Sequence, residues 1–87
     1  MKLSKEKRDK ISEQIISFLF ESSPKTPFTA EISREIARDE EFIKTLLQDL
    51  NTKGLVIPVK KNSLGQEYKR RTRWRLSNRA YSALKSM

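Results

Sequence analysis

A cluster of basic side chains is the part of this 87-residue chain best equipped for chemistry. Its members are Lys60, Lys61, Lys69, Arg70, Arg71, Arg73 and Arg75. Residues 54–87 hold 9 Lys and Arg against the single acid Glu67, whereas residues 1–53 hold 10 basic and 10 acidic residues, so the formal charge of +8 belongs to the last part of the chain. A neutral scaffold that presents concentrated positive charge is typical of a protein that binds a polyanion.

Groups suited to catalysis or metal binding are scarce. The sequence has no His and no Cys, which removes the commonest general base and the commonest soft metal ligands. Gly54 and Gly65 are its two glycines, too few for a glycine-rich phosphate loop. The carboxylates follow helical surface spacing without an apolar setting. We therefore predict a protein that is not an enzyme and that uses no metal and no cofactor.

The first expected element is a helix over residues 4–21, with Ser4 as its N-cap. Its apolar stripe is Ile11, Ile15, Phe18 and Leu19. Ile16 and Phe20 lie outside this stripe, four residues apart, and two interpretations stay open: a helix buried on a wide face, or a second apolar patch that forms a homodimer.

No apolar signal-peptide core follows Met1, and the longest apolar run, residues 15–20, is too short to span a bilayer. We therefore expect no membrane partner and a cytoplasmic location.

Two shorter helices are expected next. Pro24 and Pro27 interrupt the first helix. Thr29 is the predicted N-cap of a helix over 30–38, and Asp39 the predicted cap of a third over 40–52. The third helix has the apolar stripe Ile43, Leu46, Leu47 and Leu50, and Gly54 suits a left-handed residue after its end.

A hairpin and a last helix complete the expected order. Strands are predicted over 55–61 and 68–76, joined by a turn at residues 62–65; we call residues 55–76 the basic hairpin. Alternation in the second strand places Trp74 and Leu76 toward the core and directs Lys69, Arg71, Arg73 and Arg75 to solvent. Ser77 or Asn78 caps a helix over 78–87. The fold class is therefore α+β, in one domain over 1–87.

From Thr29 onward the chain resembles the winged helix-turn-helix domains of prokaryotic and archaeal transcription regulators of the MarR type. The residues that carry the resemblance are the apolar ladder Ile32, Ile36, Ile43, Leu47, Leu50 and Gly54, and the closing run Trp74-Arg75-Leu76-Ser77 with Ala80 and Leu84. The resemblance implies a three-helix bundle with a two-stranded hairpin, the wing, and a C-terminal helix.

In that family's usual arrangement the third helix enters the major groove and the wing touches the neighbouring backbone or minor groove. Transferred by position, the groove-facing residues are Glu41, Lys44, Thr45, Gln48 and Thr52. Thr45 and Gln48 are able to read base edges, and Lys44 is able to contact a phosphate. The run Asp39-Glu40-Glu41 instead complements the helix dipole and repels a phosphate backbone.

The basic hairpin is therefore expected to supply most of the affinity for double-stranded DNA, in a small transcription regulator or an architectural, nucleoid-associated factor. Three other readings of the charge stay open: a module that docks an acidic protein, an RNA-binding domain, and a solvated strand face that discourages edge-to-edge pairing.

Overall fold

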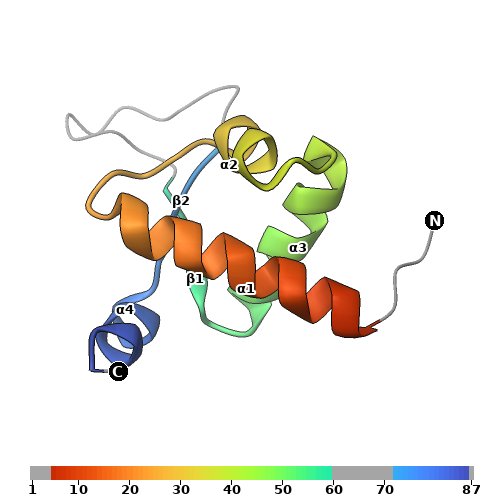
Figure 1. Ribbon diagram of the computed structural model, residues 1–87. Coiled ribbons are helices and arrows are strands. Elements are labelled where there is room, and N and C mark those ends of the chain that lie inside the picture. Colours follow the sequence, from red (N-terminus) through yellow and green to blue (C-terminus); the bar gives the residue numbers. More distant parts are fainter. Residues whose placement is uncertain (1–4, 60–71, 87) are drawn as a thin grey trace.

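Four helices surround a two-stranded antiparallel sheet in the computed structural model, which describes residues 5–59 and 72–86. In the view of Figure 1, α1 crosses in front of the sheet, α2 and α3 lie toward the top and right, and α4 lies at the lower left. The elements are α1 (Lys5–Ser22), α2 (Thr29–Ile36), α3 (Glu40–Thr52), β1 (Val56–Val59), β2 (Arg73–Leu76) and α4 (Asn78–Lys85). This is the α+β order that the sequence predicted.

The strands are shorter in the described residues than the sequence analysis expected. β1 and β2 pair in the register Val56–Leu76, Ile57–Arg75, Pro58–Trp74 and Val59–Arg73. Leu55 and Thr72 lie next to the strands but outside them. The remainder of the predicted strands, residues 60–71 with the turn, lies outside the described residues, as does the predicted cap Ser4.

One hydrophobic core joins all the elements. Its buried members are Ile11, Ile15, Leu19, Ile32, Ile43, Leu46, Leu47, Leu50, Val56, Trp74, Leu76 and Ala80. The apolar stripes predicted for the first and third helices supply seven of them, while Phe18 is only partly buried at the edge. Trp74 and Leu76 face the core, as the alternation in their strand predicted.

The turn between α2 and α3 is tight, and α2 ends earlier than the predicted residue 38. Ala37 adopts a left-handed conformation with φ of 61°. The amide of Arg38 donates to the carbonyl of Ser33 at 3.0 Å, which closes the helix end as in a Schellman motif. Asp39 caps α3 as predicted: its Oδ2 accepts from the amide of Phe42 at 3.3 Å. The turn fixes α3 against α2.

The predicted N-cap of α2 is wrong by one residue. Phe28 occupies the N-cap position, and its amide donates to Oε1 of Glu31 at 3.0 Å. Thr29 is the first helical residue instead, and its hydroxyl oxygen accepts the indole N–H of Trp74 at 2.8 Å. The hydroxyl of Thr29 therefore satisfies a buried donor of the sheet rather than the end of its own helix.

Two hydrogen-bonding arrangements hold the end of α3. Gly54 has φ of 77°, the left-handed conformation predicted for it, and the amide of Leu55 donates to the carbonyl of Leu50 at 2.9 Å. Nη2 of Arg79, from α4, donates to the carbonyl of Lys53 at 3.2 Å. A cation from the last helix thus complements the negative end of the α3 dipole.

Candidate nucleic-acid interface

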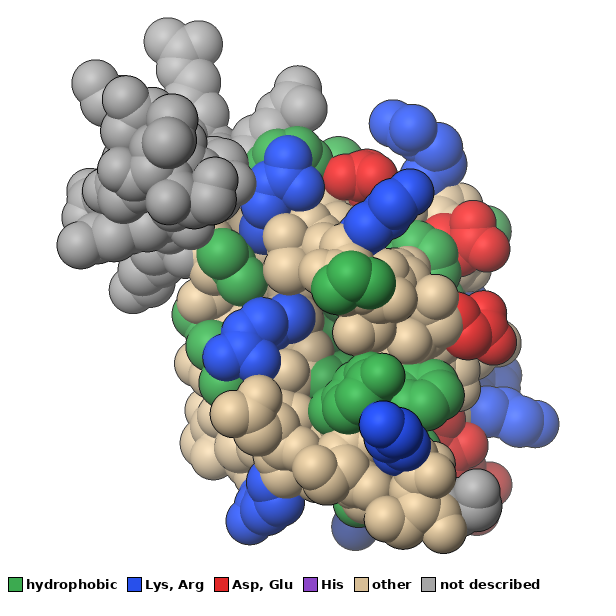
Figure 2. Space-filling model, turned by 90° about the vertical axis from the view of Figure 1, so that its left-hand side faces the viewer, with side chains coloured by type: hydrophobic (Ala, Val, Ile, Leu, Met, Phe, Trp, Pro, Cys, Tyr) green, Lys and Arg blue, Asp and Glu red, His purple; other side chains and the backbone are tan. Residues whose placement is uncertain are grey.

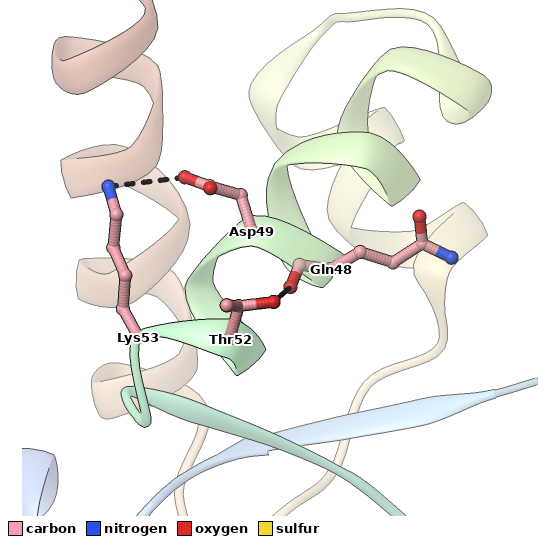
Figure 3. A network of polar contacts seen from close by, with 4 residues as sticks. All are labelled: Gln48, Asp49, Thr52 and Lys53. Atoms are coloured by element: carbon pink, nitrogen blue, oxygen red, sulfur yellow. Dashed lines mark hydrogen bonds and ion pairs between the residues drawn. The ribbon is translucent and has the colours of Figure 1, made fainter.

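The outer face of α3 carries three of the predicted site residues. Ile43, Leu46, Leu47 and Leu50 turn the other face of this helix into the core, which leaves Lys44, Thr45 and Gln48 exposed. In Figure 3 the Gln48 amide extends away from the helix, on the side opposite to Asp49 and Lys53. Asp49 and Lys53 form an ion pair of 3.1 Å at the other side of α3.

The polar groups on this face differ in how much hydrogen-bonding capacity the fold leaves them. Thr45 Oγ1 donates to the carbonyl of Glu41 at 3.0 Å, and Thr52 Oγ1 donates to the carbonyl of Gln48 at 3.1 Å (Figure 3 shows the second bond). These hydroxyls are therefore acceptors toward a ligand while the bonds persist. In Figure 3 the side-chain amide of Gln48 makes no hydrogen bond to the other residues drawn, so toward them it keeps both a donor and an acceptor, as reading an adenine edge requires.

The start of α3 is acidic and borders a groove. Glu40 and Glu41 are exposed in its first turn. Together with Glu31, Arg34 and Lys44 they line a surface hollow of about 560 Å³ between the starts of α2 and α3. Three carboxylates against two cations make this hollow a poor receptor for phosphate.

Thr72, the residue before β2, lines the same hollow as Lys44. Thr72 is also the first residue described after residues 60–71, so the start of β2 and the exposed face of α3 border the same hollow.

Arg73, in the basic hairpin, contacts the protein itself. Its guanidinium carbon lies 3.9 Å from the centroid of the Phe28 ring, and Nη1 donates to the carbonyl of Thr26 at 2.9 Å. The side chain is half-buried. The expectation that this face of the strand is solvated is not met at Arg73, because the segment before α2 packs against it.

Arg75 is also half-buried. Its Nη1 donates to the carbonyl of Leu76 at 3.0 Å and lies 3.5 Å from Oδ1 of Asn78. Five further predicted contact residues lie outside the described residues: Lys60, Lys61, Lys69, Arg70 and Arg71.

A segment that was not predicted from the sequence holds β2 from its other side. Phe28 forms an isolated antiparallel bridge with Arg73. The amide of Trp74 donates to the carbonyl of Pro27 at 3.0 Å, and the amide of Thr29 donates to the carbonyl of Thr72 at 3.2 Å. The available signal was the run Thr26-Pro27-Phe28-Thr29, in which proline and β-branched or aromatic residues favour extended backbone.

An apolar surface lies where the end of α1 meets α4. The rings of Phe20 and Tyr81 pack with centroids 5.2 Å apart, and Ile16 and Leu84 are also only partly buried. Figure 2 looks onto the side of the molecule that carries α4 and shows hydrophobic side chains gathered among Lys and Arg side chains. Phe20 therefore packs in part against α4, so the predicted patch of Ile16 and Phe20 borders α4 at Phe20.

Residues 5–59 and 72–86 contain no cluster of three acidic side chains placed to hold a metal ion. None of the helices described there combines the length and the apolar content needed to cross a bilayer.

Comparison with known proteins gives structural matches alone. No protein-family model matches the sequence, and no curated protein matches it. Among solved structures, the S. aureus MepR–DNA complex superposes with a TM-score of 0.75 at 16% identity, covering 93% of this chain and 64% of that one. Lactococcus lactis ZitR, a zinc-responsive MarR family member, superposes with a TM-score of 0.67 at 18% identity, covering 98% and 51%. A mutant of ZitR in its apo form gives a TM-score of 0.72 at 18% identity, covering 93% and 56%.

These matches establish the architecture. The chain has the winged helix-turn-helix fold that the sequence predicted, and it resembles MarR-family regulators over most of its length. It spans between 51% and 64% of the length of the matched chains named here.

Proposed function

We propose that this winged helix-turn-helix chain binds double-stranded DNA, as a small transcription regulator or an architectural factor, and mainly through its basic hairpin. The observation that supports the proposal is the hollow that Lys44 and Thr72 both line, because Thr72 directly follows the basic run of residues 60–71 in the sequence. MepR, which has the same fold, is known in complex with DNA. Such a protein would act on chromosomal DNA in the cytoplasm.

Each surface has its own role in this proposal. The cations Lys60, Lys61, Lys69, Arg70 and Arg71 neutralise phosphates and release counterions, which gives most of the affinity. On α3, Gln48 reads a base edge, Thr45 accepts a hydrogen bond and Lys44 contacts a phosphate. The carboxylates of Glu40 and Glu41 keep the start of α3 from binding a phosphate. Arg75 has part of its guanidinium used by the fold, because Nη1 donates to the carbonyl of Leu76.

The direct test is fluorescence anisotropy of a labelled random duplex at several salt concentrations. With three to five phosphates neutralised, the slope of log K against log salt should lie between about −3 and −4.5. Absence of measurable binding near physiological salt would overturn the proposal. Structured RNA can be added as a competitor for the labelled duplex in the same assay. If it displaces the duplex at a concentration equal to or lower than unlabelled duplex DNA needs, RNA rather than DNA is the ligand.

A second candidate function is a protein-interaction module that docks an acidic partner. The acidic start of α3 counts against DNA reading, because Glu40 and Glu41 stand where a DNA-reading helix gains from neutral or basic residues, and the basic hairpin would supply the charge that attracts an acidic protein. Failure to bind the duplex, together with capture of a polyglutamate peptide by the wild-type chain, would favour this function.

We also propose that the chain forms a homodimer through a surface that α1 and α4 share. Ile16, Phe20, Tyr81 and Leu84 supply its partly buried apolar surface. A dimer would present two copies of α3 to half-sites about one helical turn apart. Light scattering should give twice the chain mass of 10.2 kDa; a monomer mass at high concentration would contradict the dimer.

We do not extend the zinc response of ZitR to this chain. The sequence contains no His and no Cys to supply the usual zinc ligands.

A further inference from the structure

β2 is bonded along both of its edges. One edge pairs with β1, and the other meets the segment that leads into α2. On that second edge the amide of Trp74 donates to Pro27 and the amide of Thr29 donates to Thr72. Since α2 starts at Thr29, these bonds attach the strand directly to the first turn of the helix-turn-helix unit.

Arg73 closes this second edge with its side chain. Its guanidinium covers the Phe28 ring at 3.9 Å, and its Nη1 reaches the carbonyl of Thr26 at 2.9 Å. Thr26 and Phe28 flank Pro27, the residue that accepts the Trp74 amide. One side chain of β2 therefore contacts the leading segment on both sides of its backbone bond to the strand.

These contacts compete with phosphate binding. A guanidinium that stacks on a ring and donates to a carbonyl has less of its surface and fewer of its donors available for a second anion.

We propose that Arg73 is a positioning residue, not a phosphate ligand: it locks β2 to the segment that starts α2, and so sets the direction in which the basic hairpin leaves the domain. The effect on DNA rests on the proposed function, whereas the lock itself does not. The lock therefore has a test that needs no DNA.

That test is amide hydrogen exchange of the whole chain in three forms: wild type, Arg73→Gln and Phe28→Leu. In both variants the amides of Trp74 and Thr29 should exchange at least about tenfold faster, because local opening of this edge becomes easier. The amide of Leu55, bonded to Leu50 at the end of α3, serves as an internal control and should not change. Unchanged exchange at Trp74 and Thr29 in both variants would overturn the lock.

DNA binding then separates positioning from phosphate contact. Arg73→Gln and Phe28→Leu should each weaken duplex binding about three- to tenfold with the salt slope unchanged, and the double variant should bind no worse than Arg73→Gln. Lys44→Gln, a loss of one exposed charge on α3, should reduce the magnitude of the slope by about 0.9.

The opposite pattern would overturn the proposal: a slope reduced by about 0.9 in Arg73→Gln, with wild-type binding in Phe28→Leu. If Arg73→Gln fails to fold, Phe28→Leu, which keeps every charge, decides the question. If the wild type binds no DNA, the proposed function falls, and hydrogen exchange alone decides the lock.

Discussion

Lys44 on α3 and Arg73 on β2 are both cations that the sequence analysis assigned to the nucleic acid, but the fold treats them differently. Lys44 stands exposed on the outer row of a helix whose other face is buried. Arg73 is half-buried between a phenylalanine ring and a backbone carbonyl. A strand pressed against a neighbouring segment offers its side chains aromatic and carbonyl partners, whereas the outer row of a helix offers few. Charge counted along a sequence therefore overstates the charge left for a ligand.

The largest expected effect comes from the part of the basic hairpin next to β2. Replacing Lys69, Arg70 and Arg71 together with Gln should reduce the magnitude of the salt slope by about 2.7 and weaken duplex binding about 100-fold near 0.15 M salt. The matched control is the loss of three exposed cations elsewhere, Arg8, Lys10 and Lys85, which should leave the slope within about 1 of the wild type. Equal losses of duplex affinity and of salt slope in both triple variants would show that net charge alone determines binding. The hairpin would then have no special role.

The contact between β2 and the start of α2 should be the next most sensitive to substitution. Thr29→Val removes the acceptor of the buried Trp74 indole N–H, and we expect a loss of about 1–3 kcal/mol in the free energy of unfolding. Thr29→Ser keeps the oxygen and should lose less. Urea denaturation followed by Trp74 fluorescence measures both; equal stability of the two variants would mean that this hydrogen bond contributes little.

The acidic start of α3 should have a smaller effect, and in the opposite direction. Glu40→Gln with Glu41→Gln removes two exposed carboxylates from the side that faces the proposed DNA, so binding to random duplex should tighten about three- to fivefold at low salt. Anisotropy titrations at low and high salt measure the change. Weaker binding in this variant would indicate that the carboxylates accept hydrogen bonds from base edges instead.

The smallest expected effect concerns stability alone. Ala37 holds a left-handed conformation that costs an L-residue about 1–2 kcal/mol. Ala37→Gly should relieve that cost and lose part of the gain to the greater freedom of the unfolded chain, for a net stabilisation of about 0.5–1 kcal/mol. Thermal unfolding should show a midpoint several degrees higher. A lower midpoint would mean that the Ala37 methyl group contributes packing that outweighs the strain.

Much of the fold follows from local patterns. The stripe from Ile43 to Leu50 has helical spacing, Gly54 suits the left-handed position after the helix end, and the alternation of Trp74 and Leu76 has strand spacing. These features depend on residues close together in sequence, where periodicity and backbone preference are informative. The end of α2 was harder to predict, because an alanine occupies the left-handed position that usually signals itself with glycine.

The contacts of the candidate site were harder to predict from the sequence, because they join distant parts of the chain. Thr29 looked like a helix cap, but a tryptophan 45 residues away uses its hydroxyl. Arg73 looked solvated, but the carbonyl of Thr26 lies 47 residues before it. Neither partner can be identified from one sequence, since both depend on how the segment before α2 packs beside β2.

The double attachment of β2 has a consequence for how the domain can be divided. Both partners of this strand, β1 and residues 27–29, precede residue 60, so a backbone cut between residues 60 and 71 would sever no described bond of the strand. The smaller fragment would carry Trp74, Leu76 and Ala80, whose buried surfaces fit the larger one. The two fragments should therefore reassemble as a split protein, with the fluorescence of the single tryptophan reporting their complementation.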